Sequence, residues 1–261
     1  MRILLKLGGS LLDAASSRDA LAKQIAAARK RAEIVVVHGG GKQMTRYLAD
    51  RGVESHFVNG LRVTTPETID AVLKVFAGSV NHELVASLNR AGARAVGLSG
   101  IDAFLVEAEV MDPALGAVGR VTRANSELLE LLVKNSYTPV VACVAGDREG
   151  RIYNVNADQM AVACAASARV DHLLFLTDVN GVMDKHQQVR SQLSDSECRR
   201  LIADGVATGG MLAKLTSALE ALWAGVAQVH IVPGVVRDVI ARVLDGEELG
   251  TRIVVSEVTA K

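Results

Sequence analysis

Short apolar runs alternate with helix-like patterns along the chain. Seven runs rich in Val, Ile and Leu are bounded by turn residues and predict strands at residues 2–7, 34–38, 95–98, 139–144, 172–176, 228–232 and 252–255. Between them, apolar residues recur at helical spacing, as at Leu21, Ile25 and Ala28. Strands separated by helices predict parallel βαβ units, so we expect an α/β fold with a mainly parallel central sheet.

Capping residues mark where several helices begin. Thr65 before Pro66 has the pattern of an N-cap followed by a first helical position. Ser194 and Glu197 have the spacing of a capping box, and Asn156 offers a weaker cap. The predicted helices lie at about 19–31, 65–91, 157–168 and 194–205.

Two stretches depart from this alternation and predict hairpins. Residues 104–121 form one, and residues 140–155, around a turn at 147–150, form the other. No Pro/Ser-rich linker divides the chain. We therefore expect two lobes on one continuous sheet, with a seam near 166–170 and lobes at 1–166 and 167–261.

Composition excludes several classes of protein. The 261 residues carry a formal net charge of zero, with 49% hydrophobic and 3% aromatic residues. There is no basic stripe for nucleic acid, and no apolar run approaches the ~20 residues that span a bilayer. Cys143, Cys164 and Cys198 are isolated, which predicts reduced thiols. Because the chain enters a strand at Arg2 without a signal-peptide pattern, we expect a cytoplasmic protein.

Glycine-rich turns beside lysines provide the candidate chemistry. Lys6 lies in KLGGS after a strand, three glycines follow the next strand in VHGGGK, and Lys214 ends TGGMLAK at a helix start. Backbone N–H groups at such junctions attract anions, so these turns indicate a protein that handles phosphate. Neither G-x-G-x-x-G nor G-x-x-x-x-G-K-[ST] is present, so a Rossmann fingerprint and a P-loop are excluded.

Simpler interpretations exist for each of these residues taken alone. Lys6 could be a surface lysine whose stem lies along the strand, and Arg62 could be a surface arginine beside a turn. In NVNAD, Asn156 could simply cap a helix, which leaves Asn154 and Asp158 unexplained.

Six segments in one order give a more specific result. KLGGS, VHGGGK, NGLRVT, YNVNADQ, LTDVNGV and TGGMLAK, from Lys6 to Lys214, resemble the acetylglutamate kinases of the amino-acid kinase family. The resemblance implies an open αβα sandwich of the carbamate-kinase type, with an N-terminal lobe for the acyl-amino acid and for dimerisation and a C-terminal lobe for ATP. It implies ATP-dependent phosphorylation of the side-chain carboxylate of N-acetyl-L-glutamate, in arginine biosynthesis.

The resemblance also implies roles for residues at the reacting centre. Lys6 and Lys214 would stabilise the transferring phosphoryl group, and Asp158 would orient both lysines. Substrate binding would fall to backbone N–H groups and carboxylate-binding side chains, namely Gly40, Gly41, Arg62 and Asn154. The acceptor carboxylate, with a reference pKa near 4.3, is already ionised at pH 7, so no general base is required.

Nucleotide binding is implied for three further segments. Gly8 and Gly9 would lie against the ATP phosphates. The base and ribose would lie against two loops, formed by Asp178, Val179, Asn180, Gly181, Val182 and Met183 and by Val206, Ala207 and Thr208. Mg²⁺ would be held mainly by the nucleotide phosphates, with no metal site in the protein itself.

Other functions remain possible at this point. A kinase of the same fold could act on a carrier-linked aminoadipate or glutamate, or on another N-acylglutamate, although Arg62 favours a free α-carboxylate. A non-catalytic effector-binding subunit would be expected to lack Lys6, Asp158 or Lys214, and a dinucleotide-dependent oxidoreductase would need the missing glycine spacing.

Assembly is also implied by the resemblance. The stretch 65–91 resembles the segment that pairs across the family's dimer, with Ile69, Val72, Leu73 and Phe76 on one apolar face, although this face could instead pack within its own lobe. Relatives inhibited by arginine carry an extra helix before the first strand, and here a strand begins at Arg2. We therefore expect an arginine-insensitive homodimer.

Overall fold

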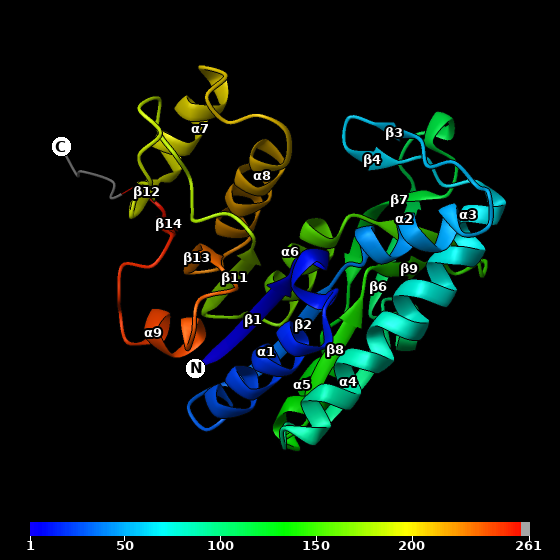
Figure 1. Cartoon of the computed structure of the whole chain (residues 1–261), viewed down its shortest axis with the longest axis horizontal. Coiled ribbons are helices and arrows are strands. Elements are labelled where there is room, and N and C mark those ends of the chain that lie inside the picture. Colours follow the sequence, from blue (N-terminus) through cyan, green and yellow to red (C-terminus); the bar gives the residue numbers. More distant parts are fainter. Residues whose placement is uncertain (257–261) are drawn as a thin grey trace.

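An eight-stranded sheet forms the centre of the computed structural model, which describes residues 1–256 (Figure 1). The strands run in the order β12-β14-β13-β11-β1-β2-β8-β5, and every neighbouring pair is parallel except β13 with β14. Their bounds are β1 Arg2–Leu7, β2 Glu33–His38, β5 Ala95–Ser99, β8 Thr138–Ala142, β11 His172–Thr177, β12 Gln192–Ser194, β13 Gln228–Pro233 and β14 Thr251–Val254. The predicted parallel sheet is confirmed.

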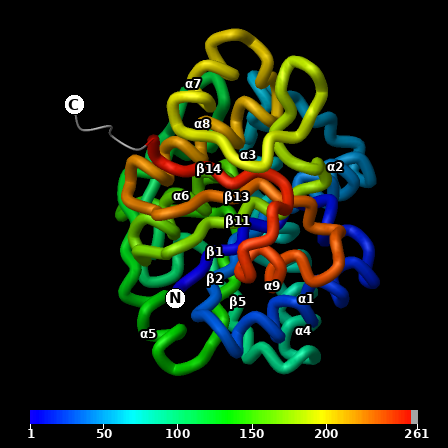
Figure 2. Tube along the Cα trace, turned by 90° about the vertical axis from the view of Figure 1, so that its left-hand side faces the viewer, coloured from blue at the N-terminus to red at the C-terminus, as the bar shows by residue number. Residues whose placement is uncertain are grey.

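Helices cover both faces of this sheet (Figure 2). One layer holds α1 (Ala15–Ala28), α4 (Asn81–Arg90) and α9 (Val239–Leu244). The opposite layer holds α5 (Glu127–Lys134), α6 (Ala157–Ser167) and α8 (Gly209–Trp223). Because helices exclude water from both sides, every residue of β1 and β2 after the first is buried, and most of these residues are apolar. The αβα sandwich is confirmed.

A small closed barrel lies beside the end of the sheet and was not predicted. It contains β6 (Val106–Val110), β7 (Val118–Ala124), β9 (Val144–Gly146) and β10 (Ile152–Val155). The hairpin predicted at 104–121 is present within it. The hairpin predicted at 140–155 is present in part, because residues 144–146 pair with 152–154 while residues 138–142 belong to the central sheet. The single strand predicted at 139–144 is wrong, because the chain leaves the sheet at Cys143 and enters the barrel as β9.

The predicted helical stretch 65–91 is confirmed, with one feature that the sequence did not reveal. The Thr65 hydroxyl accepts from the Thr68 N–H at 3.2 Å and caps α3 (Pro66–Val72). A π-helical segment, Leu73–Val80, then joins α3 to α4. The capping box at Ser194 is also present, at the start of α7 (Asp195–Ala203). Helix α1 begins at Ala15, before the predicted residue 19.

The apolar face assigned to dimer contacts lies mostly inside the chain. Val72 is 0% and Phe76 is 6% exposed, and both belong to the core. Ile69 and Leu73 are half-buried against the same core. The prediction that all four side chains face a partner is therefore wrong for Val72 and Phe76, which pack within their own chain. Within residues 1–256, no helix combines the length and apolar character that crossing a membrane requires.

Candidate active site

The predicted site residues gather at the carboxyl ends of neighbouring parallel strands. Lys6 lies near the end of β1, the three glycines follow β2, and Asp178 follows β11. Strands β2, β1 and β11 are adjacent and parallel, so their carboxyl ends meet at one edge of the sheet. In open α/β sheets this edge is where ligands bind.

Three charged side chains from different elements meet at this edge. The Lys6 ammonium lies 2.8 Å from Asp158 Oδ1, and the Lys214 ammonium donates to Asp158 Oδ2 at 3.3 Å. Lys6 is 8% exposed and Asp158 is 5% exposed, so both charges are buried. The structure thus brings together the predicted Lys6, Asp158 and Lys214, with the carboxylate between the two ammonium groups.

Asp158 is held ionised in this arrangement. Burial by itself raises the pKa of the carboxyl, but the positive charges and hydrogen bonds of Lys6 and Lys214 outweigh burial and hold its pKa below the usual value. Helix α6 positions the group: the Asn156 side chain caps the helix by accepting from the Asp158 N–H at 2.8 Å, which places Asp158 in the first turn. Two ammonium groups and one carboxylate leave one positive charge uncompensated.

The predicted substrate-binding residues line one small cavity of about 180 Å³. Its polar walls include Gly40, Gly41, Arg62 and Asn154, as predicted. Apolar walls come from side chains that the sequence did not single out for this site, namely Leu61, Phe76, Val118 and Cys143. The combination of a guanidinium, an amide and an apolar wall suits a small acylated amino acid.

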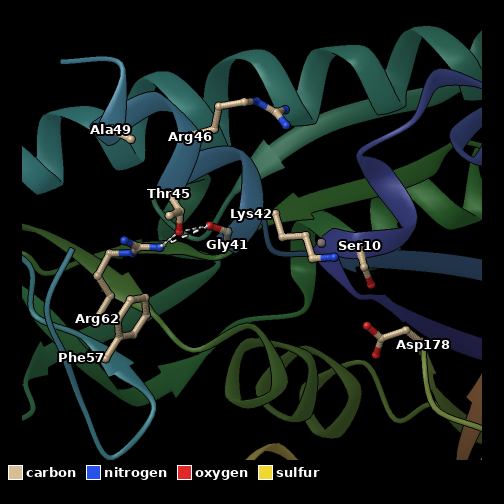
Figure 3. A pocket seen from close by; sticks show the side chains of 10 residues that line it. Ser10, Gly41, Lys42, Thr45, Arg46, Ala49, Phe57, Arg62 and Asp178 are labelled. Atoms are coloured by element: carbon tan, nitrogen blue, oxygen red, sulfur yellow. Dashed lines mark hydrogen bonds between the residues drawn. The ribbon is translucent and has the colours of Figure 1, made fainter. Parts of the chain in front are cut away.

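Arg62 is fixed in place before any ligand binds. Its guanidinium donates to Thr45 Oγ1 at 2.8 Å, to the Gly41 carbonyl at 3.2 Å and to the Ser55 hydroxyl, and it lies over the Phe57 ring (Figure 3). Burial lowers the pKa of Arg62 from its very high ordinary value, and the group stays charged at neutral pH. Arg62 comes from β4 (Leu61–Arg62), which pairs with β3 (Phe57–Val58) in a hairpin that the sequence did not predict.

A larger cavity, of about 610 Å³, lies beside the first and shares Gly41, Phe57 and Arg62 with it. Gly9, Ser10, Lys42 and Asp178 belong to its wall (Figure 3). The two glycine loops are close there, since a Cβ built on Gly9 would lie 3.2 Å from the Gly41 nitrogen. The Gln43 amide also donates to the Gly9 carbonyl at 3.1 Å.

The two glycines after β1 differ in what they can offer an anion. The Gly8 N–H donates to the Leu176 carbonyl at 3.1 Å, so it is not available to a phosphate. Gly9 begins a 3₁₀ turn, Gly9–Leu12, and the first N–H groups of a helical turn have no partner within the turn. Gly9 and Ser10 are therefore better placed than Gly8 to donate to a phosphate.

Of the segments predicted to contact base and ribose, only Asp178 lines either of the two cavities. Asp178 reaches the larger cavity, and Val179 and Met183 are exposed. Val182 is 1% exposed and its N–H donates to Thr251 Oγ1 at 2.8 Å, which ties this loop to β14. Residues 206–208 lead directly into α8, which carries Lys214.

Side chains that could serve as a nucleophile or base are inactive here. Burial raises the pKa of Cys143 to about 12 and lowers the pKa of His38 to about 4, so both are neutral at pH 7. His38 Nδ1 donates to the Gly39 carbonyl at 2.9 Å, and Asn81 donates to His38 Nε2 at 2.9 Å, which gives His38 a supporting role beneath the glycine loop. Within residues 1–256, no three His, Cys, Asp or Glu side chains are arranged to hold a metal ion.

Sequence reasoning missed Ser10, Lys42, Thr45, Phe57 and Phe76 as parts of the two cavities. Ser10 and Lys42 each end a glycine motif, so their position in KLGGS and VHGGGK was a usable signal. Helix α2 (Gly41–Ala49) was not predicted, and Thr45 lies one turn after Gly41 on it, so the helical period would have indicated Thr45 only if that helix had been predicted.

Comparison with known proteins agrees with this geometry. A model of the amino acid kinase family matches residues 1–233. An acetylglutamate kinase from Solibacter usitatus (strain Ellin6076) is 68% identical over 255 residues, which cover 97% of this chain and 99% of the relative. The solved structure of smu.665 from Streptococcus mutans UA159 is 29% identical with a TM-score of 0.82, covering 97% of this chain and 98% of that one.

A further solved structure supports the fold. N-acetylglutamate synthase from Neisseria gonorrhoeae, complexed with coenzyme A and N-acetyl-glutamate, has a TM-score of 0.87 at 23% identity. The match covers 98% of this chain and 59% of that one, so the chain spans about three-fifths of this neighbour's length. The sequence matches and the shared fold together show that the chain belongs to the amino acid kinase family, among the acetylglutamate kinases.

Proposed function

We propose that the chain transfers the terminal phosphoryl group of ATP to the side-chain carboxylate of N-acetyl-L-glutamate, forming N-acetyl-L-glutamyl 5-phosphate for arginine biosynthesis. The observation that carries the proposal is the buried ion-pair network in which Asp158 joins Lys6 to Lys214. The identity of 68% to an acetylglutamate kinase over nearly the whole chain supports the same activity.

The network matches what the reaction needs. An ionised carboxylate attacks without a general base, and the neutral Cys143 and His38 supply none. Charge on the transferring phosphoryl oxygens must be stabilised at fixed positions. Lys6 and Lys214 supply positive charge opposite those oxygens, and Asp158 holds the two ammonium groups in place, so little reorganisation is needed when the transition state forms.

The smaller cavity fits the acceptor. We infer that Arg62 and Asn154 hold the α-carboxylate and that the backbone of Gly40 and Gly41 donates to the substrate. Support comes from their common cavity and from the hydrogen bond that Asn154 Nδ2 donates to Thr64 Oγ1 at 3.1 Å, two residues after Arg62 in the chain. The apolar wall would then take the N-acyl group.

The nucleotide would occupy the space between the glycine turn after β1 and the segments 178–183 and 206–208. When bound, Mg²⁺ would neutralise part of the negative charge of the ATP phosphates. The larger cavity has a single carboxylate, Asp178, in its wall, which fits a metal held mainly by phosphate oxygens. This placement assigns residues 1–166 to the acceptor lobe and 167–261 to the nucleotide lobe, with residues 257–261 outside the part of the chain that the structure describes.

A homodimer that functions in the cytoplasm completes the proposal. Ile69 and Leu73, which are half-buried, remain available for a contact between the N-terminal lobes. ATP is plentiful in the cytoplasm, and the three buried free cysteines suit its reducing conditions.

Trapping of the acyl phosphate tests the activity. Purified protein incubated with Mg-ATP, N-acetyl-L-glutamate and hydroxylamine should give the hydroxamate, while N-succinyl-L-glutamate and free glutamate should give much less. Absence of hydroxamate with acetylglutamate would refute the proposal. Equal turnover of a carrier-linked aminoadipate or glutamate would instead identify the related kinase of the same fold.

A further inference from the structure

Lys42 lines the larger cavity and is not part of the ion-pair network of Lys6, Asp158 and Lys214. It lies in the first turn of α2, directly after the three glycines, and its side chain is exposed. Figure 3 shows its ammonium extending toward the region where Ser10 and Asp178 lie. These residues and Gly9 line the same cavity of about 610 Å³.

The other cations of this cavity are already engaged. Arg62 donates to Thr45 and to the Gly41 carbonyl, and Arg46 pairs with Asp13 at 3.0 Å. Lys42 makes no ion pair within residues 1–256, although its charge helps to hold the pKa of Asp178 below the usual value. Burial acts on Asp178 in the opposite direction and is the largest single influence, but the hydrogen bonds to the carboxylate and the charge of Lys42 outweigh it. Arg62 is also assigned above to the α-carboxylate of the acceptor. Lys42 is therefore the cation of this cavity that has neither an ion pair among the described residues nor a role in the proposed acceptor binding.

The surroundings of Lys42 favour a phosphate chain over the amino-acid acceptor. Gly9, Ser10, Lys42 and Asp178 line the larger cavity and do not line the smaller one that holds Asn154. The N-terminus of α2, whose partial positive charge attracts anions, faces the same region as Lys42. Besides the engaged Arg46 and Arg62, the wall offers the Lys42 ammonium and the Asp178 carboxylate, which together suit a ligand that carries both signs of charge, as a nucleotide polyphosphate with its metal does.

We propose that Lys42 binds the β- and γ-phosphates of the nucleotide from the acceptor lobe, as a third lysine of the phosphoryl-transfer site. The proposal rests on the function proposed above and specifies how the nucleotide is held. Because the contact exists with bound ATP as well as in the transition state, its loss lowers ATP affinity more than it lowers kcat. AMP has neither phosphate, so its affinity does not depend on Lys42.

The ratio of ATP affinity to AMP affinity tests the proposal. Isothermal titration of the full chain with Mg-ATP and with AMP compares the wild type with Lys42→Met, Lys42→Arg and Lys23→Met. Lys23 is an exposed lysine of α1 outside both cavities and serves as the matched control. In Lys42→Met we expect ATP affinity to fall about 10-fold, as for loss of a charge-assisted hydrogen bond, with AMP affinity unchanged. Lys42→Arg should retain most of the ATP affinity and Lys23→Met all of it.

Two results would overturn the proposal. An unchanged ATP-to-AMP ratio in Lys42→Met would show that Lys42 does not contact the phosphates, and an equal fall for both nucleotides would show a general effect on the fold or on nucleoside binding. The hydroxamate assay on the wild type separates this proposal from the proposed function. Normal hydroxamate with an unchanged ratio refutes only the role of Lys42, and a changed ratio without hydroxamate refutes only the reaction.

Discussion

At the scale of single residues, Asp158 fixes the positions of the two ammonium groups in the candidate active site. Its two carboxylate oxygens each contact one lysine, so neither ammonium can move far without losing that contact. We predict that Lys6→Met and Lys214→Met each lower kcat roughly 10²-fold or more, since each removes a preorganised charge from the transition state. Steady-state kinetics with acetylglutamate check this, and circular dichroism confirms folding. A loss confined to KM would contradict the assignment.

Arg62 should affect substrate binding instead of the chemical step. We predict that Arg62→Ala raises the KM for acetylglutamate about 10-fold or more with a smaller change in kcat, because a carboxylate contact made in the ground state is lost. Arg46→Ala is the matched control: Arg46 lies nearby on α2, but its side chain is 61% exposed and pairs with Asp13. If both variants bind acetylglutamate like the wild type, the proposed orientation of the substrate is wrong.

His38 should make stability depend on pH. Burial, which outweighs the hydrogen bond to Gly39, lowers its pKa from 6.5 in the unfolded chain to about 4 in the folded one. Between these values the unfolded chain binds a proton that the folded chain does not, so the free energy of unfolding falls as pH falls from 6.5 toward 4. For this one group the loss is about 2 kcal/mol between pH 7.5 and pH 5.

Urea unfolding of His38→Asn at several pH values tests this effect. The shorter amide retains a donor for the Gly39 carbonyl but does not titrate, so the decline between pH 7.5 and pH 5 should be shallower by about that amount. His230, whose pKa burial lowers to about 3, acts in the same direction and accounts for part of the remaining slope. Parallel curves for wild type and variant would show that His38 is not the titrating group.

At the scale of elements, the loop after β2 depends on the π-helical segment Leu73–Val80. Phe76 of that segment packs so closely that a Cβ on Gly40 would lie 2.8 Å from its ring. The Gly40 φ of −174° is extended backbone, so the constraint comes from contact and not from conformation. Gly41, the next residue, has no atom within 4 Å of a built Cβ.

Alanine substitutions test whether Gly40 is confined by Phe76 while Gly41 is not. We predict that Gly40→Ala lowers the free energy of unfolding by about 1–3 kcal/mol through overpacking, whereas Gly41→Ala leaves it nearly unchanged. Adding Phe76→Leu to Gly40→Ala should cost less than the sum of the two single changes. Chemical denaturation measures all four variants. Additive effects would mean that Gly40 and Phe76 are not in contact in solution.

Elements were predictable from the sequence where burial is uniform. The strands β1, β2 and β11 are covered on both faces, so their apolar runs stand out. The β3–β4 hairpin has strands of two residues with an exposed Phe57, which leaves no periodic pattern to detect. The break at Cys143 was also hidden, because residues on both sides of it are buried and apolar in the sheet and in the barrel alike.

The candidate site was predictable to the extent that it depends on local motifs. Lys6, Asp158 and Lys214 each lie in a short segment of recognisable type, so the family resemblance predicted that they would lie together, as they do. The site contains two cavities whose walls include side chains from distant segments, such as Phe57 and Phe76. No local sequence pattern predicts how those side chains pack. The same reason explains why the availability of Lys42 became apparent only from the engagement of its neighbours.

At the scale of the whole molecule, the two lobes share one continuous sheet, which limits how far they can move relative to each other when ligands bind. Strand β1 pairs with β11 over five residues, so the two sides cannot separate widely. Motion is more readily available to exposed loops at the edge of the sheet. The β3–β4 hairpin, where Phe57 is 55% exposed, contributes to both cavities, and Asp178, at the start of the loop after β11, lines the larger one.

We therefore predict that these two loops approach each other when both ligands are bound. Spin labels can be attached at two exposed positions, through Val58→Cys and Lys185→Cys. Pulsed electron–electron double resonance should give a shorter distance between the labels with acetylglutamate and a non-hydrolysable ATP analogue bound than without ligand. Native Cys143, Cys164 and Cys198 are buried and should not take up label.

A control pair, Lys23→Cys with Leu131→Cys, lies on α1 and α5 of the N-terminal part, and the distance between its labels should not change. Each ligand alone should produce a smaller shift, because we propose that each fills only one of the two cavities that Phe57 borders. Identical distances with and without both ligands would mean that the site is already closed around its three charged residues and that binding needs no movement of the hairpin.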